Sequence, residues 1–282
     1  MTYVADEIAS QPESWRRAAS HPALALLPQP GQRVAVVGCG TSWFMAMAYA
    51  ALREAAGHGE TDAFAASEFP RSRTYDRVVA ITRSGTTTEV LAVNPDTVIL
   101  GDESSPAAQA PNVVALPWAD ERSVVQTRFA TSALALLRAS LGEDLSKAIA
   151  DAHTALSMEL PAFADLDEVT FLGRGWTIGL AHEAALKCRE AAVFWAESYP
   201  AMDFRHGPIS ISAPGRAVWS FGEVPDGLQD DVARTGAAFV HHTGLDPLAG
   251  LMVAQRFAVA LAESRGLNPD APRNLTRSVV LE

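Results

Sequence analysis

The feature that most constrains the fold is a unit that occurs twice: a short apolar strand, a Gly-x-Gly turn and a helix. We expect strand 33–38 with helix 43–56, and strand 169–172 with helix 177–195. A strand–turn–helix unit of this kind builds parallel sheets that carry helices on their faces. Its recurrence predicts two copies of a doubly wound α/β unit.

Neither glycine turn completes the dinucleotide-binding pattern Gly-x-Gly-x-x-Gly. In the turns that begin at Gly38 and Gly173, the position of the third glycine holds Trp43 and Ile178. The glycines of that pattern let the backbone approach a pyrophosphate closely. We therefore expect no nicotinamide or flavin cofactor, and the sequence predicts no metal site.

The remaining segments alternate between strand and helix in the same way. We expect further strands at 62–66, 77–82, 97–100, 112–116, 216–221 and 237–241. Further helices are expected at 3–20 with a break at Gln11-Pro12, after residue 88 to about 92, and at 122–141, 143–160, 226–235 and 247–265. Residues 21–31 form a linker, and the tail is irregular.

Composition excludes several classes of protein. The net charge of −11 over 282 residues argues against a nucleic-acid groove, although it permits a local phosphate site. Cys39 and Cys188 are too few for a disulfide framework and match no zinc pattern, so a reducing cytosol is the expected setting. No apolar run is long enough to span a membrane, and the N-terminus lacks the order of a signal peptide.

Lysine is rare in this chain, and one of its two lysines lies between two acids. Among 22 basic residues only Lys147 and Lys187 are lysines, and Lys187 is preceded by Glu183 and followed by Glu190. Offsets of four and three place these side chains on one face of a helix. Lysine can change protonation state during chemistry, whereas arginine stays charged. The pattern fits either a solvated face of ion pairs or a catalytic cluster.

A second cluster of polar residues follows the strand that ends at Thr82. From Thr82 to Thr87 the chain offers hydroxyl groups and backbone N–H groups at a strand-to-helix turn. Such a turn suits a phosphate monoester. The alternative is that Ser84 or Thr86 only caps the helix.

Nine short motifs, in this order, resemble the double sugar-isomerase (SIS) domain family, above all the isomerase half of glutamine–fructose-6-phosphate amidotransferase. They are Glu7-Ile-x-x-Gln11-Pro12, Cys39-Gly-Thr-Ser42, Ala66-Ser-Glu-Phe69, Ser84-Gly-x-Thr87, Leu172-Gly-Arg-Gly175, Glu183-Ala-Ala-Leu-Lys187-x-x-Glu190, Ala196-Glu-x-Tyr199, His206-Gly-Pro208 and Pro272-Arg-Asn-Leu275-x-x-Ser278. Segment 120–131 is closer to the stand-alone amino-sugar-phosphate deaminases and ketose–aldose isomerases of this family.

The resemblance implies an α/β fold of two tandem SIS-type subdomains, each a doubly wound parallel sheet in a flavodoxin-like sandwich. It divides the chain into an N-terminal helix and lead-in (1–30), a phosphate-binding subdomain (31–160), a subdomain with the catalytic helix (161–265) and a tail over the active site (266–282). It also implies a homodimer with shared active sites.

For the catalytic residues, the resemblance implies that Glu190 moves a proton between adjacent sugar carbons, while Glu183 and Lys187 orient hydroxyls and relay protons. One well-placed carboxylate with a suitable pKa is enough for this step. His206 corresponds to the residue that opens the sugar ring and comes from the neighbouring subunit. Its alternative role is that of a turn residue before Gly-Pro.

For the binding residues, the resemblance implies phosphate contacts from Ser84 and Thr87, next to Thr82. Ser42 corresponds to a serine that contacts the sugar, with helix capping as the alternative. Arg83 replaces a neutral side chain of the family and either contacts the substrate or points into solvent. Gln126 is expected to contribute to the substrate site as well.

The tail departs from the amidotransferase. Arg277 occupies the place of the lysine that forms a Schiff base with the keto sugar, and arginine does not form Schiff bases. The chain also begins almost at the isomerase half, so we expect no release of ammonia from glutamine. The arginine at 277 disfavours a subunit that would rely on a separate glutaminase.

These features predict an isomerase and deaminase of an amino-sugar phosphate such as glucosamine 6-phosphate. The alternatives are a deglycase, which splits an amino acid from a sugar phosphate, an isomerase subunit of a glucosamine-6-phosphate synthase-like enzyme and a non-catalytic sugar-phosphate sensor.

Overall fold

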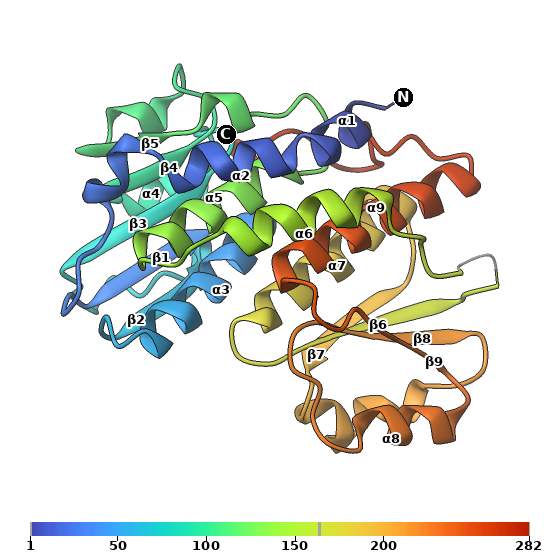
Figure 1. Cartoon of the computed structure of the whole chain (residues 1–282). Helices are drawn as coiled ribbons and strands as arrows, with labels where there is room; N and C mark the ends of the chain where they lie inside the picture. The colour runs from blue at the N-terminus through green and yellow to red at the C-terminus, as the bar shows by residue number, and fades with distance from the viewer. Residues whose placement is uncertain (1, 163–164, 282) are drawn as a thin grey trace.

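The computed structural model describes residues 2–162 and 165–281, which form two parallel sheets with helices between and around them (Figure 1). The first sheet consists of β1 (Val34–Gly38), β2 (Thr61–Ala65), β3 (Arg77–Thr82), β4 (Thr97–Leu100) and β5 (Asn112–Ala115). The second consists of β6 (Glu168–Gly173), β7 (Ala196–Pro200), β8 (Arg216–Ser220) and β9 (Ala238–His241). All pairings within both sheets are parallel.

Nine α-helices accompany these strands in the described part of the chain. They are α1 (Tyr3–Ala9), α2 (Gln11–Ala19), α3 (Thr41–Ala55), α4 (Thr88–Val93), α5 (Arg128–Ser140), α6 (Ser146–Ser157), α7 (Thr177–Ala192), α8 (Leu228–Thr235) and α9 (Pro247–Ser264). None of these helices is long and apolar enough to cross a membrane.

The strand order gives each sheet one point of reversal, where a ligand crevice is expected. The first sheet has the order β2-β1-β3-β4-β5 and the second β7-β6-β8-β9, so the winding direction reverses between β1 and β3 and between β6 and β8. In open α/β sheets, ligands bind outside the carboxyl ends of the strands at such a reversal. The predicted pair of doubly wound α/β units is confirmed, and the turns after β1 and β3 lie on either side of the first crevice.

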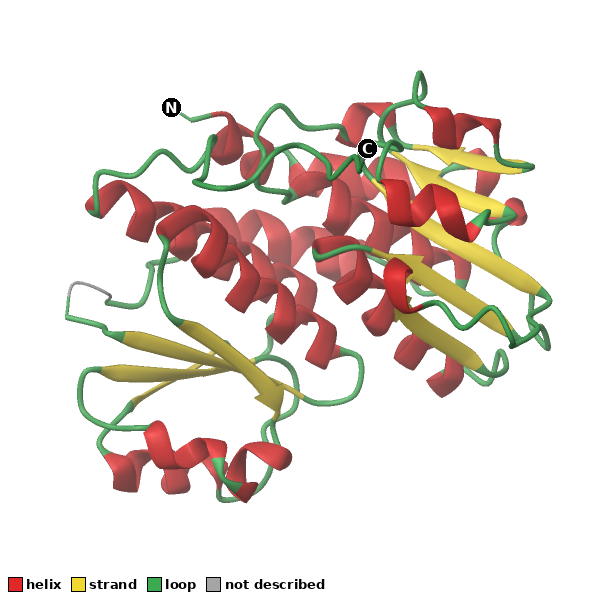
Figure 2. Ribbon diagram, turned by 180° about the vertical axis from the view of Figure 1, so that it is seen from behind, coloured by secondary structure: helices red, strands yellow, loops and turns green. Residues whose placement is uncertain are grey.

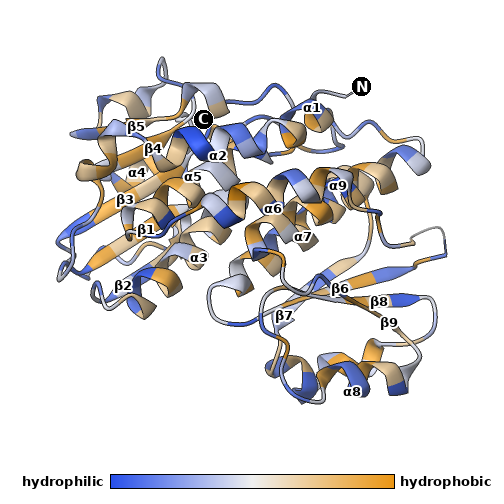
Figure 3. Ribbon diagram, in the orientation of Figure 1, coloured by the Kyte–Doolittle hydropathy of each residue, from blue (hydrophilic) through white to orange (hydrophobic). Residues whose placement is uncertain are grey.

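Helices from both halves pack together between the two sheets (Figure 2). One continuous core includes Val36 of β1, Leu180 of α7 and Trp219 of β8, all of which are buried. Figure 3 shows the strands of the first sheet mostly in hydrophobic colours, as expected for parallel strands that are covered on both faces. The two halves therefore share one hydrophobic core, and the subdomain boundaries predicted from the sequence stay predictions.

Helices α3 and α7 approach each other unusually closely at Gly179. A Cβ atom added at Gly179 would lie 2.3 Å from the backbone oxygen of Phe44 and 3.0 Å from the backbone nitrogen of Ala48. Only glycine allows two backbones to pass at this distance. The first turn of α3 and the middle of α7 both carry polar side chains. The backbone contact at Gly179 therefore sets the distance between these two groups of side chains.

Several element boundaries differ from those expected, and for two of them the structure shows the physical reason. Helix α5 begins at Arg128, because the Glu121 carboxylate accepts hydrogen bonds from the N–H groups of Thr127 (2.6 Å) and Arg128 (2.7 Å); the expected helical start at 122 is therefore wrong. Helix α7 ends at Ala192, because Val193 adopts a left-handed conformation with φ of 49°. Strand β7, which follows directly, was not predicted from the sequence.

We expect Gly179→Ala to lower the free energy of unfolding by about 2 kcal/mol, the usual cost of forcing an extra carbon into a packed interior. The backbone of α3 cannot move aside as a flexible side chain would. The matched control is Gly250→Ala in α9, where an added Cβ would meet only ring carbons of Phe221, at 3.6 Å and beyond. There the better helix propensity of alanine should leave stability unchanged or raise it by up to about 1 kcal/mol. Urea unfolding of both variants measures the difference, and equal stabilities would disprove the tight contact.

Candidate active site

A cleft of about 180 Å³ opens at the reversal point of the first sheet. It lies between the turn after β1, the loop after β3, segment 124–126, the end of α7 and the C-terminal tail. Its polar lining includes Thr41, Arg83, Thr87, Gln126, Glu190 and Arg277. Five of these six residues are site residues predicted from the sequence, and Thr41 was missed, although it lies inside the motif that ends in Ser42.

The predicted cluster on α7 forms, and it is buried rather than solvated. The Nζ atom of Lys187 lies 2.5 Å from Glu190 Oε2 and 3.4 Å from Glu183 Oε1. The side chains of Lys187 and Glu183 are 1% and 0% exposed, whereas that of Glu190 is 18% exposed and lines the cleft. The alternative of a solvent-exposed ion-paired face is therefore wrong. Glu190 is the member of the cluster that a ligand in the cleft meets.

Burial and neighbouring charges shift the protonation equilibria of this cluster. Burial raises the pKa of Glu183 to about 7; the nearby ammonium of Lys187 opposes the rise and the charge of Glu190 adds to it. Burial on its own disfavours the charged form of Lys187, but the carboxylates of Glu183 and Glu190 outweigh it and raise the pKa of Lys187. Near neutral pH, Glu183 therefore gains and loses a proton readily while Lys187 stays an ammonium.

Thr41, at the start of α3, holds Lys187 from the opposite side. Lys187 donates a hydrogen bond to Thr41 Oγ1 at 3.0 Å. This hydroxyl also favours the charged form of Glu183 and so opposes part of the rise in its pKa that burial causes. The contact spans 146 residues of sequence and depends on the close approach of α3 and α7 at Gly179. Thr41 therefore joins the two halves of the chain at the cluster.

The loop from Thr82 to Thr87 is fixed by its own side chains. Thr82 Oγ1 accepts a hydrogen bond from the N–H of Gly85 at 3.1 Å, and Ser84 Oγ accepts one from the N–H of Thr86 at 3.3 Å. Gly85 has φ of 62°, and an added Cβ would lie 1.9 Å from the Ser105 hydroxyl, so only glycine fits. Helix α4 begins at Thr88 without a side-chain cap, so the alternative that Ser84 or Thr86 caps it is wrong.

The C-terminal tail lies on this loop. Thr86 Oγ1 is 2.8 Å from Ser278 Oγ, and the N–H of Thr88 donates to the carbonyl of Val279 at 3.3 Å. The N–H of Leu281 in turn donates to Thr88 Oγ1 at 2.9 Å. The tail that follows α9 thus returns to the first sheet, as both views of the fold show (Figures 1 and 2), and its residues 275–279 line the cleft.

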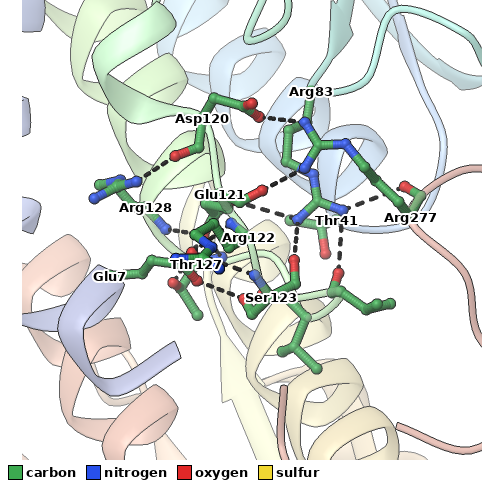
Figure 4. Close-up of polar contacts among 12 residues, drawn as sticks. Glu7, Thr41, Arg83, Asp120, Glu121, Arg122, Ser123, Thr127, Arg128 and Arg277 are labelled. Carbon is green, nitrogen blue, oxygen red and sulfur yellow. Dashed lines mark hydrogen bonds and ion pairs between the residues drawn. The ribbon is translucent and has the colours of Figure 1, made fainter. Parts of the chain in front are cut away.

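Arg83 contacts both the tail and the neighbouring segment 123–124 (Figure 4). Its side chain is 1% exposed and donates hydrogen bonds to the carbonyls of Ser123 (2.9 Å), Val124 (3.2 Å) and Arg277 (3.2 Å). The alternative in which Arg83 points into solvent is therefore wrong. Arg277 is more exposed than Arg83, and it donates hydrogen bonds to Asp120 Oδ1 at 2.6 Å and to the carbonyl of Glu121.

Two buried carboxylates hold the segment that Arg83 contacts. Glu7 Oε1 accepts hydrogen bonds from the N–H of Arg122 at 2.6 Å and of Ser123 at 3.3 Å. Glu121 Oε2 lies 3.7 Å from Arg83 NH1, and burial raises the pKa of Glu121 while Arg83 opposes the rise. These contacts present Gln126 to the cleft, where its buried Oε1 accepts no hydrogen bond from the described residues.

Six of the eleven predicted site residues do not line this cleft: Thr82, Ser84, Glu183 and Lys187 are buried in the loop and the α7 cluster described above, and the other two are Ser42 and His206. Ser42 is buried in the first turn of α3 and is not its N-cap, so the capping alternative is wrong. His206 is exposed at the end of the short 3₁₀ helix Asp203–His206, which follows β7 in the second half. The cleft of this chain therefore forms without either side chain.

We expect Arg83→Gln to lower the free energy of unfolding by about 3 kcal/mol, because it leaves the Glu121 carboxylate buried without its cation. The amide protons of Thr88 and Leu281 should also exchange faster with solvent, since Arg83 no longer holds the tail. The control is Arg277→Gln, whose partly exposed ion pair with Asp120 contributes about 0–1 kcal/mol. Urea unfolding and hydrogen exchange measure both effects. Equal behaviour of the two variants would show that Arg83 does not hold the tail.

Comparison with known proteins supports the resemblance seen in the motifs. The chain is 29% identical to the isomerizing glutamine–fructose-6-phosphate aminotransferase of Sulfolobus acidocaldarius over 89% of its own length and 50% of that protein. It is 28% identical to the corresponding protein of Synechocystis over 96% of its length and 56% of that protein. The chain thus spans about half the length of these relatives. No family model matches it.

Solved structures share the fold over nearly the whole chain. The glucosamine-6-phosphate deaminase of Thermotoga maritima superposes with a TM-score of 0.82 at 24% identity, covering 99% of this chain and 100% of that one. The C-terminal domain of the glucosamine-fructose-6-phosphate aminotransferase of Francisella tularensis gives 0.81 at 20% identity, covering 96% and 98%. The tagatose-6-phosphate ketose/aldose isomerase of Escherichia coli gives 0.80 at 20% identity, covering 100% and 96%. The chain is thus similar in sequence to the isomerase-containing half-length region of these aminotransferases, and it shares with the three solved structures a fold of two tandem parallel α/β units.

Proposed function

We propose that this chain is a phosphosugar aldose–ketose isomerase that acts on an amino-sugar phosphate and releases ammonia. The observation that carries the proposal is the α7 cluster, in which a partly exposed carboxylate, Glu190, is held 2.5 Å from a buried lysine at the edge of a cleft. Relatives and structural neighbours whose names include isomerase and deaminase activities on sugar phosphates support the same class of reaction.

In this proposal Glu190 moves one proton between C1 and C2 of the open-chain sugar. A carboxylate does this well when it is fixed near both carbons and its pKa lies near the working pH. Lys187 fixes Glu190 by an ion pair and is itself fixed by Thr41. Glu183, with its pKa raised to about 7, passes protons to and from the sugar oxygens through Lys187.

The phosphate group binds at the loop 82–87 in this proposal. The Thr87 side chain lines the cleft next to Arg83, and the unpaired amide oxygen of Gln126 is available to a sugar hydroxyl. The hydroxyl of Ser84 and the backbone N–H groups of the loop supply further hydrogen-bond partners for phosphate oxygens. Arg83 adds its positive charge from beneath the loop while its N–H groups hold the tail.

The placement of cations favours the direction in which nitrogen leaves the sugar. Forming a Schiff base with a keto sugar needs an exposed amine, yet Lys187 is 1% exposed, and the exposed Lys147 pairs with Asp151 on α6. Arg277, in the position of the family's lysine, binds Asp120. An amino-sugar phosphate brings its own nitrogen, and proton transfer from C2 to C1 leaves an imine at C2. Water then hydrolyses this imine to a ketose phosphate and ammonia.

A homodimer completes the site in this proposal, with His206 of each chain reaching the cleft of the other. His206 is exposed and does not line the cleft of its own chain. Imidazole accepts and donates protons near neutral pH, which suits opening of the sugar ring. A purely sugar-sensing protein would need the loop 82–87 but neither Glu190 nor Lys187, so the buried cluster favours an enzyme.

We expect Glu190→Gln to lower the turnover number for the preferred amino-sugar phosphate about 10²–10⁴-fold, because the proton acceptor is lost while its shape is kept. Exchange of the C2 proton with solvent deuterium should fall by the same factor, whereas substrate binding should change little. Ammonia release from a panel of amino-sugar phosphates identifies the substrate. The control is Glu263→Gln on the exposed side of α9, which should keep full activity. Undiminished C2 exchange in Glu190→Gln would exclude Glu190 as the base.

We expect a His206→Asn chain and a Glu190→Gln chain, each inactive alone, to recover activity when they are combined in one heterodimer. If the residues act across the interface, one of the two sites then contains both native side chains. Mixing differently tagged chains, purifying the heterodimer and measuring turnover provides the test. A verified heterodimer without activity would show that His206 does not act in the partner's site.

A further inference from the structure

The motif Glu7-Ile-x-x-Gln11-Pro12 lies near the start of the chain, but its two long polar side chains are in the interior. Glu7 is 4% exposed and Gln11 is 0% exposed. Gln11 donates a hydrogen bond to Gln255 Oε1 of α9 and accepts one from Thr131 Oγ1 of α5, both at 2.7 Å. Buried polar groups are stable only with partners of this kind. Helices α1 and α2 are therefore anchored to α5 and α9.

The first turn of α1 is bound by the segment that follows α9, and Figure 1 shows the two next to each other. The Asp270 carboxylate accepts hydrogen bonds from the N–H groups of Tyr3 and Val4, each at 2.8 Å. The unpaired N–H groups and the dipole of a helix favour a negative charge at this end. The carbonyl of Asp270 accepts a further hydrogen bond from the N–H of Val124 at 3.1 Å. Asp270 thus joins α1, the tail and segment 122–125.

Glu7, in the second turn of α1, binds segment 122–125 directly (Figure 4). In addition to its two backbone hydrogen bonds with Arg122 and Ser123, its carboxylate accepts a hydrogen bond from the Ser123 hydroxyl. The same hydroxyl lies 2.8 Å from the carbonyl of Val125. Ser123 is 1% exposed and Val125 is 2% exposed, so water does not replace these partners. The backbone of segment 122–125 is therefore fixed from α1.

Segment 122–125 connects α1 with the cleft. The carbonyls of Ser123 and Val124 accept the hydrogen bonds of Arg83, which also donates to the carbonyl of Arg277. Val124 itself lines the cleft. The tail between Asp270 and Arg277 is therefore held at both ends, and both attachments pass through residues 123 and 124.

We propose that Glu7 is a positioning residue of the substrate site. It fixes segment 122–125, and through this segment it fixes Gln126, Arg83 and the stretch of tail from 271 to 277. Glu7 does not line the cleft, so it acts on a ligand only through these groups. This inference rests on the proposed function, since it concerns the binding of the same amino-sugar phosphate.

The groups that Glu7 positions bind the substrate, whereas other groups move its protons. In the proposed site the loop 82–87, Gln126 and the tail contact the phosphate and the sugar. Proton transfer belongs to Glu190 and Lys187, and Lys187 is held by partners on α7 and α3. Loss of the Glu7 side chain should therefore raise KM and leave kcat nearly intact. A purely structural role would do the opposite, because unfolded molecules lower kcat without changing the KM of the folded ones.

The test measures kcat and KM for glucosamine 6-phosphate in the full chain. We expect Glu7→Ala to raise KM about tenfold, because two buried N–H groups lose their acceptor and the segment shifts. Glu7→Gln should restore KM to within about threefold of the wild type, because its amide oxygen accepts the two N–H groups and its amide nitrogen donates to the Ser123 hydroxyl. The matched control is Glu13→Ala on α2, whose side chain is 63% exposed and which should keep both constants.

Hydrogen exchange tests the same contacts without reference to turnover. The amide protons of Val124, Thr88 and Leu281 should exchange faster in Glu7→Ala and at the wild-type rate in Glu13→Ala. Asp270→Ala provides a second variant, at the surface end of α1, should Glu7→Ala fail to fold. It removes the acceptor of the Tyr3 and Val4 N–H groups, and it should raise KM and speed up the same exchange.

The outcomes separate this inference from the proposed function. A lower kcat with unchanged KM in Glu7→Ala would show that Glu7 only stabilises the fold, and equal impairment in Glu7→Gln would overturn the hydrogen-bond argument. Unchanged exchange of all three amide protons in both variants would overturn the positioning role even if the enzyme is an isomerase. A wild-type chain that turns over no amino-sugar phosphate would remove the proposed function, while faster exchange in Glu7→Ala would still support the hold of α1 on the tail.

Discussion

A buried ammonium is stable only where carboxylates and hydroxyls surround it, and the candidate site depends on how Lys187 meets this requirement. Two of its partners, Glu183 and Glu190, come from its own helix, and the third, Thr41, comes from the other half of the chain. Thr41 reaches Lys187 because α3 and α7 touch backbone to backbone at Gly179. The packing of α3 against α7 therefore also sets the ionic and hydrogen-bond partners of Lys187. The cleft lies beside this cluster.

Local sequence patterns predicted those features of the structure that are set by residues close together in the sequence. The alternation of strands and helices predicted both parallel sheets, because each buried strand is read from a short apolar run. The spacing of Glu183, Lys187 and Glu190 predicted their meeting, since helical geometry alone sets it. The role of Glu190 could be proposed at that stage, but its greater exposure within the trio required the fold.

Contacts between distant segments could not be predicted in this way. Arg83 appeared to be either a phosphate ligand or a solvent-exposed side chain, because the sequence does not reveal that Ser123 and Arg277 meet it. Helix α5 starts late because Glu121 caps it from outside the helix, at a position that no capping pattern covers. Thr41 was missed for the same reason, since its partner lies 146 residues away.

The chemical groups of the cleft limit the reactions it can support. In the part of the chain that the structure describes, the lysine at the cleft is paired with Glu183 and Glu190, and its raised pKa keeps it charged at neutral pH. A charged amine is not a nucleophile, so it cannot form a Schiff base with a carbonyl. The groups that remain are carboxylates, hydroxyls and guanidiniums, which move protons and bind anions. In the proposed reaction, nitrogen therefore arrives on the substrate and water completes its release, so the tail held by Arg83 would have to admit one small molecule while it covers the sugar.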